Sequence, residues 1–240
     1  MRRGYILSIL LTCAALAAAQ TSPIPDTIAQ ANVVELNRDS AKIQIVNSSD
    51  KDISAYTVLI EEVYQDGHVN SHERSADAGP YSDFVIAAGH SVEEPNPLTN
   101  FPNNPVIDVR AKLILVVFSD LTAYVVSEDA FQRVLANRRE SAEATREVAD
   151  IIQRVTKSED AHPSQSAIAE INQITATKQP GSSRPVPMAF SSTLDDLKRV
   201  PELSSRLKIG ERDYLNQLQA KYRGEADKFA ARMNVRKVNQ

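Results

Sequence analysis

Two histidines lie close enough in the sequence to suggest a metal site. His68 and His72 are four residues apart, with Asp66 and Glu73 beside them. On a helix this spacing would bring two imidazoles to one ion. The neighbouring residues are instead typical of a hairpin and a strand, where four residues span about 13 Å. We therefore predict no metal-ligating residues.

Two other spacings could support acid–base or nucleophilic chemistry. Glu61 and Glu62 are adjacent, so on a strand their carboxyl groups point to opposite faces and cannot act on one substrate; we expect both at a solvated edge. Ser48 and Lys51 match the Ser-x-x-Lys spacing of penicillin-recognising enzymes, but they lie in a turn rather than at the start of a buried helix. We predict no catalytic residue and no cofactor.

A basic stretch near the C-terminus could bind a charged surface. Its cations lie partly opposite Tyr222 and Phe229, and they are Lys221, Arg223, Lys228, Arg232, Arg236 and Lys237. Such a helix either lies on an anionic membrane or forms the hydrated side of a packed bundle. A membrane surface bound through residues 211–237 is thus one alternative. Trp is absent, so no obvious platform for stacking bases or sugars is present, and we expect no nucleic-acid partner.

The N-terminus has the pattern of an export signal. Arg2 and Arg3 precede an apolar stretch and three alanines, which predicts a signal peptide over residues 1–19 and cleavage between Ala19 and Gln20. We expect an exported protein, periplasmic or secreted. Two alternatives are lipidation at Cys13, disfavoured by the large residue before it, and a twin-arginine route.

Charge is unevenly distributed along the chain. The net charge of -4 combines Arg2 and Arg3 with 15 acidic and 6 basic residues over 20–126 and 16 acidic and 19 basic residues over 127–240. The first part is therefore about -9 and the second about +3. This asymmetry indicates either two differently hydrated surfaces or electrostatic docking, within the molecule or between copies.

The first half has the periodicity of a β-sandwich. Short β-branched segments over residues 32–126 alternate apolar and polar side chains and are separated by turn clusters. Residues 20–31 are expected to form a tether, Tyr81–Ala87 a short strand, and the prolines from Glu93 to Pro105 a crossing segment. The longest strand is expected over Val106–Phe118.

One stretch of this half resembles a known family. Residues 45–67, Ile-Val-Asn-Ser-Ser-Asp-Lys-Asp-Ile-Ser-Ala-Tyr followed by a segment ending Val-Tyr-Gln-Asp-Gly, are similar to FxLYD-type and related immunoglobulin-like modules of exported bacterial proteins. The resemblance implies an antiparallel immunoglobulin-like β-sandwich. It implies no catalytic residues.

The second half is predicted to be helical, which makes the fold class α+β. Ser127 is a good N-cap, so a long helix and a second helix are expected over 127–177. Residues 178–191 are rich in Pro, Ser and Gly and indicate a linker. Further helices are expected over 192–240.

The double-sided apolar character of two strands predicts where the helices dock. A strand whose outer face is apolar must be covered. We therefore predict a helix-docking face formed by Tyr56, Val58, Ile60, Ile114, Val116 and Phe118.

These observations favour a non-enzymatic binding or scaffolding module of the cell envelope, with a protein partner or a second copy as its ligand. One alternative is an envelope hydrolase whose site is assembled from scattered Asp, Glu and His residues. A third is a protein that self-assembles through the long helix.

Overall fold

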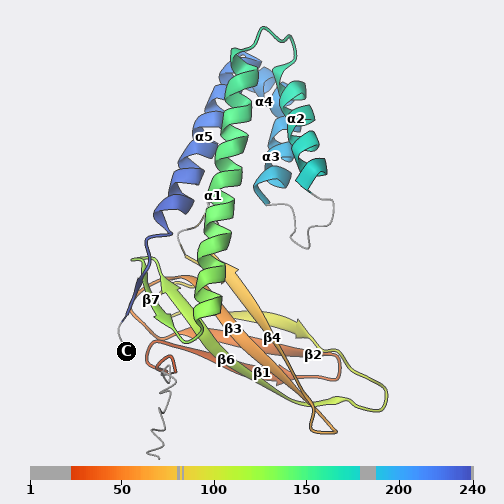
Figure 1. Ribbon diagram of the computed structural model, residues 1–240, viewed down its shortest axis with the longest axis vertical. Coiled ribbons are helices and arrows are strands. Elements are labelled where there is room, and N and C mark those ends of the chain that lie inside the picture. Colours follow the sequence, from red (N-terminus) through yellow and green to blue (C-terminus); the bar gives the residue numbers. More distant parts are fainter. Residues whose placement is uncertain (1–22, 80–81, 83, 179–187, 239–240) are drawn as a thin grey trace, which may run out of the picture.

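The computed structural model describes residues 23–79, 82, 84–178 and 188–238, and over these residues the fold is α+β. Eight strands form two mostly antiparallel sheets, and five helices follow the seventh strand. The predicted fold class is confirmed at this level. Figure 1 shows the helices standing as an arm on one end of the sheets.

The two sheets differ in size. The smaller has the order β1-β2-β5, with β1 at Ala29–Leu36, β2 at Ser40–Asn47 and β5 at Ser91–Pro97. The larger has the order β4-β3-β6-β7-β8, formed by β3 (Ile53–Tyr64), β4 (Val69–Asp77), β6 (Val106–Phe118), β7 (Thr122–Val125) and β8 (Arg236–Lys237). Neighbouring strands are antiparallel except β7 and β8, which are parallel.

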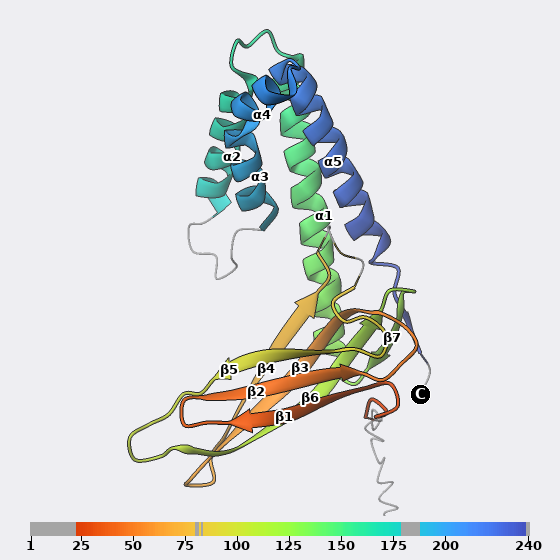
Figure 2. The same ribbon diagram turned by 180° about the vertical axis from the view of Figure 1, so that it is seen from behind.

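The main core lies between the two sheets, which Figure 2 shows one in front of the other. Alternation in β2 buries Ala41, Ile43 and Ile45 on this face and leaves their neighbours half-exposed. The opposing side chains come from β3 and β6, and each strand therefore contributes every second residue to the core.

A second cluster on the outer face of the larger sheet holds the first helix. There Ala55, Leu115 and Val117 pack against Phe131 and other residues at the start of that helix. Of the six residues predicted to form the docking face, only Ile114 lies in this cluster. The other five, Tyr56, Val58, Ile60, Val116 and Phe118, are buried between the sheets, so this part of the prediction is wrong.

A β-bulge in β6 is the physical reason why Ile114 lies on the opposite face from Val116 and Phe118. Leu113 pairs with Val58 and Leu115 with Thr57, so Ile114 is an extra residue and the inward-facing positions change from odd to even numbers beyond it. Both faces of this stretch are buried, and an apolar pattern therefore cannot distinguish them.

The helices pack together into an arm that stands on the sheets. Helix α1 (Glu128–Lys157) begins at the predicted N-cap, Ser127, whose hydroxyl accepts a hydrogen bond from the backbone N–H of Ala130. Helix α5 (Glu211–Ala231) runs beside α1, while α2 (Pro163–Lys178), α3 (Met188–Lys198) and α4 (Val200–Leu207) pack at the far end (Figure 1). A separate apolar cluster, which includes Ile152, Phe190 and Leu215, holds this end together.

Several predicted boundaries differ from the structure. The expected tether contains buried Ile24 and the start of β1, so from residue 23 onward it belongs to the folded domain. Within the expected crossing segment, residues up to Pro97 form β5, which tolerates Pro95 and Pro97 because it is an edge strand.

Other segments were also assigned wrongly or lie outside the described part. Among the described residues of the expected strand Tyr81–Ala87, only Ile86 forms a bridge, to Ile53. The predicted linker falls largely on residues 179–187, outside the described residues, and α3 already begins at Met188. Strand β8 was not predicted.

Candidate functional site

The residues singled out from the sequence do not come together in one site. Ala19 and Gln20 lie outside the described residues. Ser48 and Lys51 lie in the turn between β2 and β3, where the Lys51 ammonium pairs with Asp120 at 2.6 Å. His68 lies in the turn before β4, whereas His72 lies on β4 itself and faces β5.

Neither metal nor membrane-spanning features are found in the described part of the chain. Its His, Cys, Asp and Glu side chains form no group of three or more that could hold a metal ion. None of its helices is both long enough and apolar enough to cross a membrane.

A buried arginine joins the arm to the sheets. Arg138, on α1, is 1% exposed, and its guanidinium donates to Asp77 on β4 through Nε at 2.9 Å and Nη2 at 2.7 Å. The same guanidinium donates to the backbone oxygen of Arg232 at 2.7 Å and to the Ser54 hydroxyl at 3.4 Å. One side chain thus connects α1, the end of α5 and both β3 and β4.

A second arginine completes this junction. Arg232, at the C-cap of α5, donates through Nη1 to the backbone oxygens of Ala78 and Gly79, at 2.8 and 3.0 Å. Its Nη2 donates to the backbone oxygen of Ser82 at 2.8 Å. The segment after β4 is therefore fixed to the base of the arm.

Several of the charged residues pair with one another within the molecule. Basic residues of α1 meet acidic residues of β4, as Arg138 with Asp77 and Arg133 with Glu73. In the basic C-terminal stretch, Lys221 pairs with Asp196 on α3, and Arg223 contacts Asp150. Lys237 and Arg232 are engaged at the base of the arm, so four of the six cations predicted as a surface patch make contacts inside the chain.

A polar groove opens between the edge strands of the two sheets, β4 and β5, which cross in the view of Figure 2 and contact each other through His72 and Asn96. Its volume is ≈ 410 Å³, within the range of about 300–1,000 Å³ common for small-molecule sites. The groove is lined by Glu62, Asn70, His72, Arg74, Asn96, Pro97 and Thr99. These residues come from β3, β4, β5 and the loop that follows β5.

Glu62 lies at the base of this groove and is only 2% exposed. The nearest donors to its carboxyl group are the Asn96 amide at 3.4 Å and the Tyr64 hydroxyl at 3.2 Å. The Tyr64 hydroxyl has one proton and lies closer, at 2.9 Å, to the backbone oxygen of Thr99. The Glu62 carboxyl group thus accepts two long hydrogen bonds, and the Tyr64 hydroxyl lies between it and the backbone oxygen of Thr99.

The other groove side chains link the two sheets. His72 Nε2 lies 3.1 Å from Asn96 Oδ1; since an amide oxygen only accepts, Nε2 is the donor of this hydrogen bond. The Arg74 guanidinium donates to the backbone oxygen of Pro95 and lies 3.9 Å from the Glu94 carboxylate. Burial, together with a hydrogen bond to Glu94, raises the pKa of Tyr56, which therefore remains a neutral donor.

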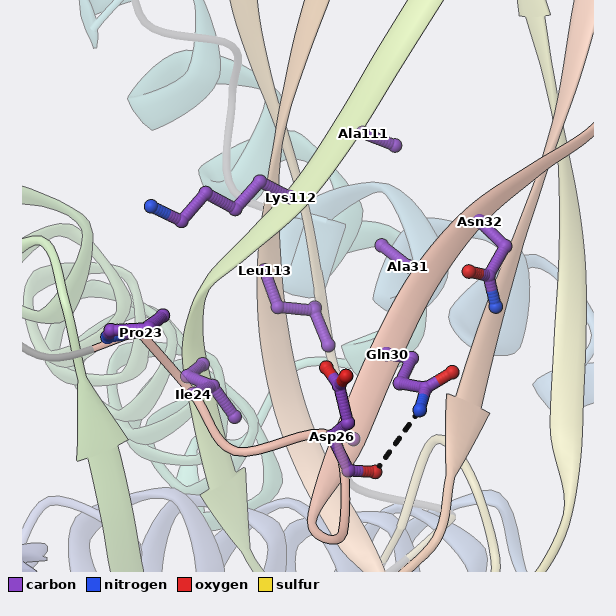
Figure 3. Close-up of a pocket in the computed structure, with 10 residues that line it drawn as sticks. Pro23, Ile24, Asp26, Gln30, Ala31, Asn32, Ala111, Lys112 and Leu113 are labelled. Carbon is purple, nitrogen blue, oxygen red and sulfur yellow. Dashed lines mark hydrogen bonds between the residues drawn. The ribbon is translucent and has the colours of Figure 1, made fainter.

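A smaller cavity of ≈ 200 Å³ lies on the opposite side of the sheets, between β1 and β6. Figure 3 shows Ile24 and Leu113 among the residues that line it, and the side chain of Lys112 extending away from that of Asp26. The Gln30 amide donates to the backbone oxygen of Asp26 at 3.3 Å. This cavity has no converging charged groups, so the groove at Glu62 is the stronger candidate site.

Sequence reasoning assigned Glu62 to a solvated edge, and the structure corrects this. Along β3, the core positions Tyr56, Val58 and Ile60 continue with period two to Glu62 and Tyr64, so this carboxyl group points between the sheets. That periodicity was the signal available in the sequence. For Arg138 no comparable signal exists, because it lies among the charged residues of a long helix.

Comparisons with known proteins returned no match: no family model, curated protein or solved structure is similar to this chain.

Proposed function

We propose that the protein is a non-enzymatic binding or scaffolding module of the cell envelope, in which the sheets form one binding unit and the arm presents a second. The observation that supports this most strongly is the buried Arg138, which fixes the arm to the sheets through two hydrogen bonds to Asp77. A flexible attachment would not require a buried guanidinium with four acceptors.

The arm has the geometry of a spacer. Helix α1 has 30 residues and is thus about 45 Å long at about 1.5 Å per residue. Its base is packed through Phe131, and α5 returns along it to the sheet through β8. The helical cluster at the far end is therefore held at a set distance from the sheets.

The proposal also includes an immunoglobulin-like fold for the two sheets and an exported location for the protein. The face-to-face arrangement of the two sheets is consistent with an immunoglobulin-like sandwich of the kind that the FxLYD-type resemblance implies. An exported, periplasmic or secreted protein follows from the signal pattern at the N-terminus. A partner protein or a second copy is its expected ligand.

Cross-linking followed by affinity purification from the native envelope tests this function. We expect wild-type protein to capture a specific partner, and Arg138→Met to lose it because the two binding units are no longer held together. Arg139→Met, at the neighbouring exposed position, is the matched control and should retain the partner. Specific capture that is equal for both variants would contradict the rigid spacer, and the absence of any specific partner would contradict the binding module.

Self-assembly through the long helix remains an alternative proposal. The apolar residues at both ends of α1 are buried within the chain, against the sheet and against α5, which favours the spacer function. Light scattering after size-exclusion chromatography distinguishes the two. A strictly monomeric protein would remove self-assembly.

An envelope hydrolase is a second candidate, favoured by one observation: the Glu62 carboxyl group and the His72 imidazole both contact Asn96 in the groove. A carboxyl group and an imidazole are common general acids and bases. Turnover of ester, amide or glycoside substrates that is lost in both Glu62→Gln and His72→Gln would support hydrolysis over binding.

A further inference from the structure

We infer that the groove between β4 and β5 is a binding site for a neutral saccharide. This deepens the proposed function, on which it rests, because it names the ligand class of the binding unit formed by the sheets. Glu62 has a 2% exposed carboxyl group that accepts only long hydrogen bonds, from Asn96 at 3.4 Å and Tyr64 at 3.2 Å. A ligand hydroxyl in the groove could donate a shorter hydrogen bond to this carboxyl group.

The charges of the groove select against ionic ligands. The lining holds one acidic group, Glu62, and one basic group, Arg74, whose side chain is 38% exposed, so it matches neither a net anion nor a net cation. Both groups can instead bind neutral hydroxyls, since a carboxyl oxygen accepts and a guanidinium donates.

The other polar side chains of the groove include both hydrogen-bond donors and acceptors. The Asn70 amide offers both a donor and an acceptor, whereas the Asn96 amide already contacts His72 and Glu62. Sugar hydroxyls donate and accept at once, so a ring of vicinal hydroxyls matches this lining. An aliphatic ligand would leave these groups without partners.

An exposed aromatic residue follows the groove residue Thr99 two positions later in the chain. Phe101 is 54% exposed and packs against the Tyr64 ring, with centroids 5.9 Å apart. Tyr64 in turn donates to the backbone of Thr99, which lines the groove. The apolar face of a sugar ring could therefore cover Phe101 while its hydroxyls reach Glu62. From the sequence alone, with no Trp, such a platform was not apparent.

The groove is suited to binding rather than cleavage of a glycoside. Enzymes of that class generally use two carboxyl groups on either side of the bond. Among the residues that line the groove, Glu62 supplies the only carboxyl group. Glu94, the nearest other one on β5, is already bound by Tyr56 and lies beside Arg74.

The test uses the full mature chain and saturation-transfer NMR with a panel of neutral hexose and N-acetylhexosamine monomers and oligomers. We expect at least one neutral sugar to bind, and its affinity to fall about tenfold or more in Glu62→Gln, which loses the charged acceptor. Glu61→Gln, the adjacent residue facing the other side of β3, is the matched control and should bind as the wild type. Phe101→Ala, at an exposed position, should weaken binding without affecting folding.

Each other outcome overturns the inference. The first is that no neutral sugar binds. The second is that a sugar binds and that Glu62→Gln and Phe101→Ala both leave its affinity unchanged. The third is that the charged analogues glucuronate or glucosamine bind more tightly than the neutral sugars. Capture of a partner from the envelope, measured separately, then shows whether the proposed function still holds without the sugar site.

Discussion

Arg138 and Asp77 form a two-point ion pair that joins the first half of α1 to β4, the edge strand of the larger sheet. Guanidinium Nε and Nη2 lie 2.9 and 2.7 Å from the two carboxylate oxygens. The arginine side chain is 1% exposed and that of the aspartate 27%. The pair therefore lies at the boundary of the interior, where its loss leaves several groups without partners.

Replacing Arg138 by Met should lower the free energy of unfolding by about 3 kcal/mol, since it leaves Asp77 and the backbone oxygen of Arg232 without their donor. Urea denaturation followed by circular dichroism measures this. Arg139→Met, at an exposed neighbouring position, should change stability by less than about 0.5 kcal/mol. Similar losses for both variants would show that the buried pair has no special role.

Removing residues 236–240 should destabilise the protein by about 1–2 kcal/mol and promote association. The deletion removes the hydrogen bonds from Arg236 N–H to Leu121 and from Val238 N–H to Ala123, and it exposes the edge of β7. Light scattering and thermal unfolding report both effects. A truncated protein that stays monomeric with unchanged stability would contradict a structural role for β8.

Asp196 should make stability depend on pH in the acid range. Burial acts to raise its pKa, but hydrogen bonds from Lys221 and Tyr222, both at 2.8 Å, outweigh burial and hold the pKa below its ordinary value of 3.8. A lowered folded-state pKa contributes stability above pH 3.8, and this is lost as the pH falls through the folded value.

Asp196→Asn should therefore cost about 1 kcal/mol at neutral pH and progressively less below pH 3.8. Urea denaturation of both proteins between pH 7 and pH 2 measures the difference. Asp195→Asn, at the adjacent exposed position, is the control. A cost that stays constant down to pH 2 would show that the charge of Asp196 is not what stabilises α3 against α5.

Lys208→Gly should increase stability by about 0.5–1 kcal/mol. Lys208 ends α4 with φ 58 and ψ 36, a left-handed conformation that glycine adopts without a Cβ penalty. Thermal unfolding measures the gain. A lower melting temperature would show that its side chain makes a compensating contact.

Gly224→Ala should also stabilise the protein, by about 1 kcal/mol. Gly224 lies within α5, and an added Cβ would meet no atom within 4 Å. The same unfolding experiment applies, and a loss of stability would mean that the helix surface at this point is more crowded than the structure shows.

The sequence predicted those features that depend on local patterns. Alternation identified β2, and the Ser127 N-cap placed the start of α1 correctly. The immunoglobulin-like detail of the fold stays a prediction. The two faces of β6 could not be assigned because both are apolar and the bulge at Ile114 reverses their order.

The groove and the junction depend on contacts between distant residues. Asn96 and His72 meet because two edge strands from different sheets lie side by side, and no local pattern encodes that proximity. Arg138 binds Asp77, which lies 61 residues away in the sequence. Such pairs follow from tertiary structure, whereas the inward orientation of Glu62 followed from period two along β3.

The parallel pairing of β7 and β8 constrains the order in which the parts of the chain can fold. Parallel neighbours require a crossover connection, and here that connection is the whole helical arm, from α1 to α5. Strand β8 can join the sheet only when the two ends of the arm have been brought together by the packing of α1 against α5. We therefore expect pairing of the last strand to be a late step, which reports that the arm has folded.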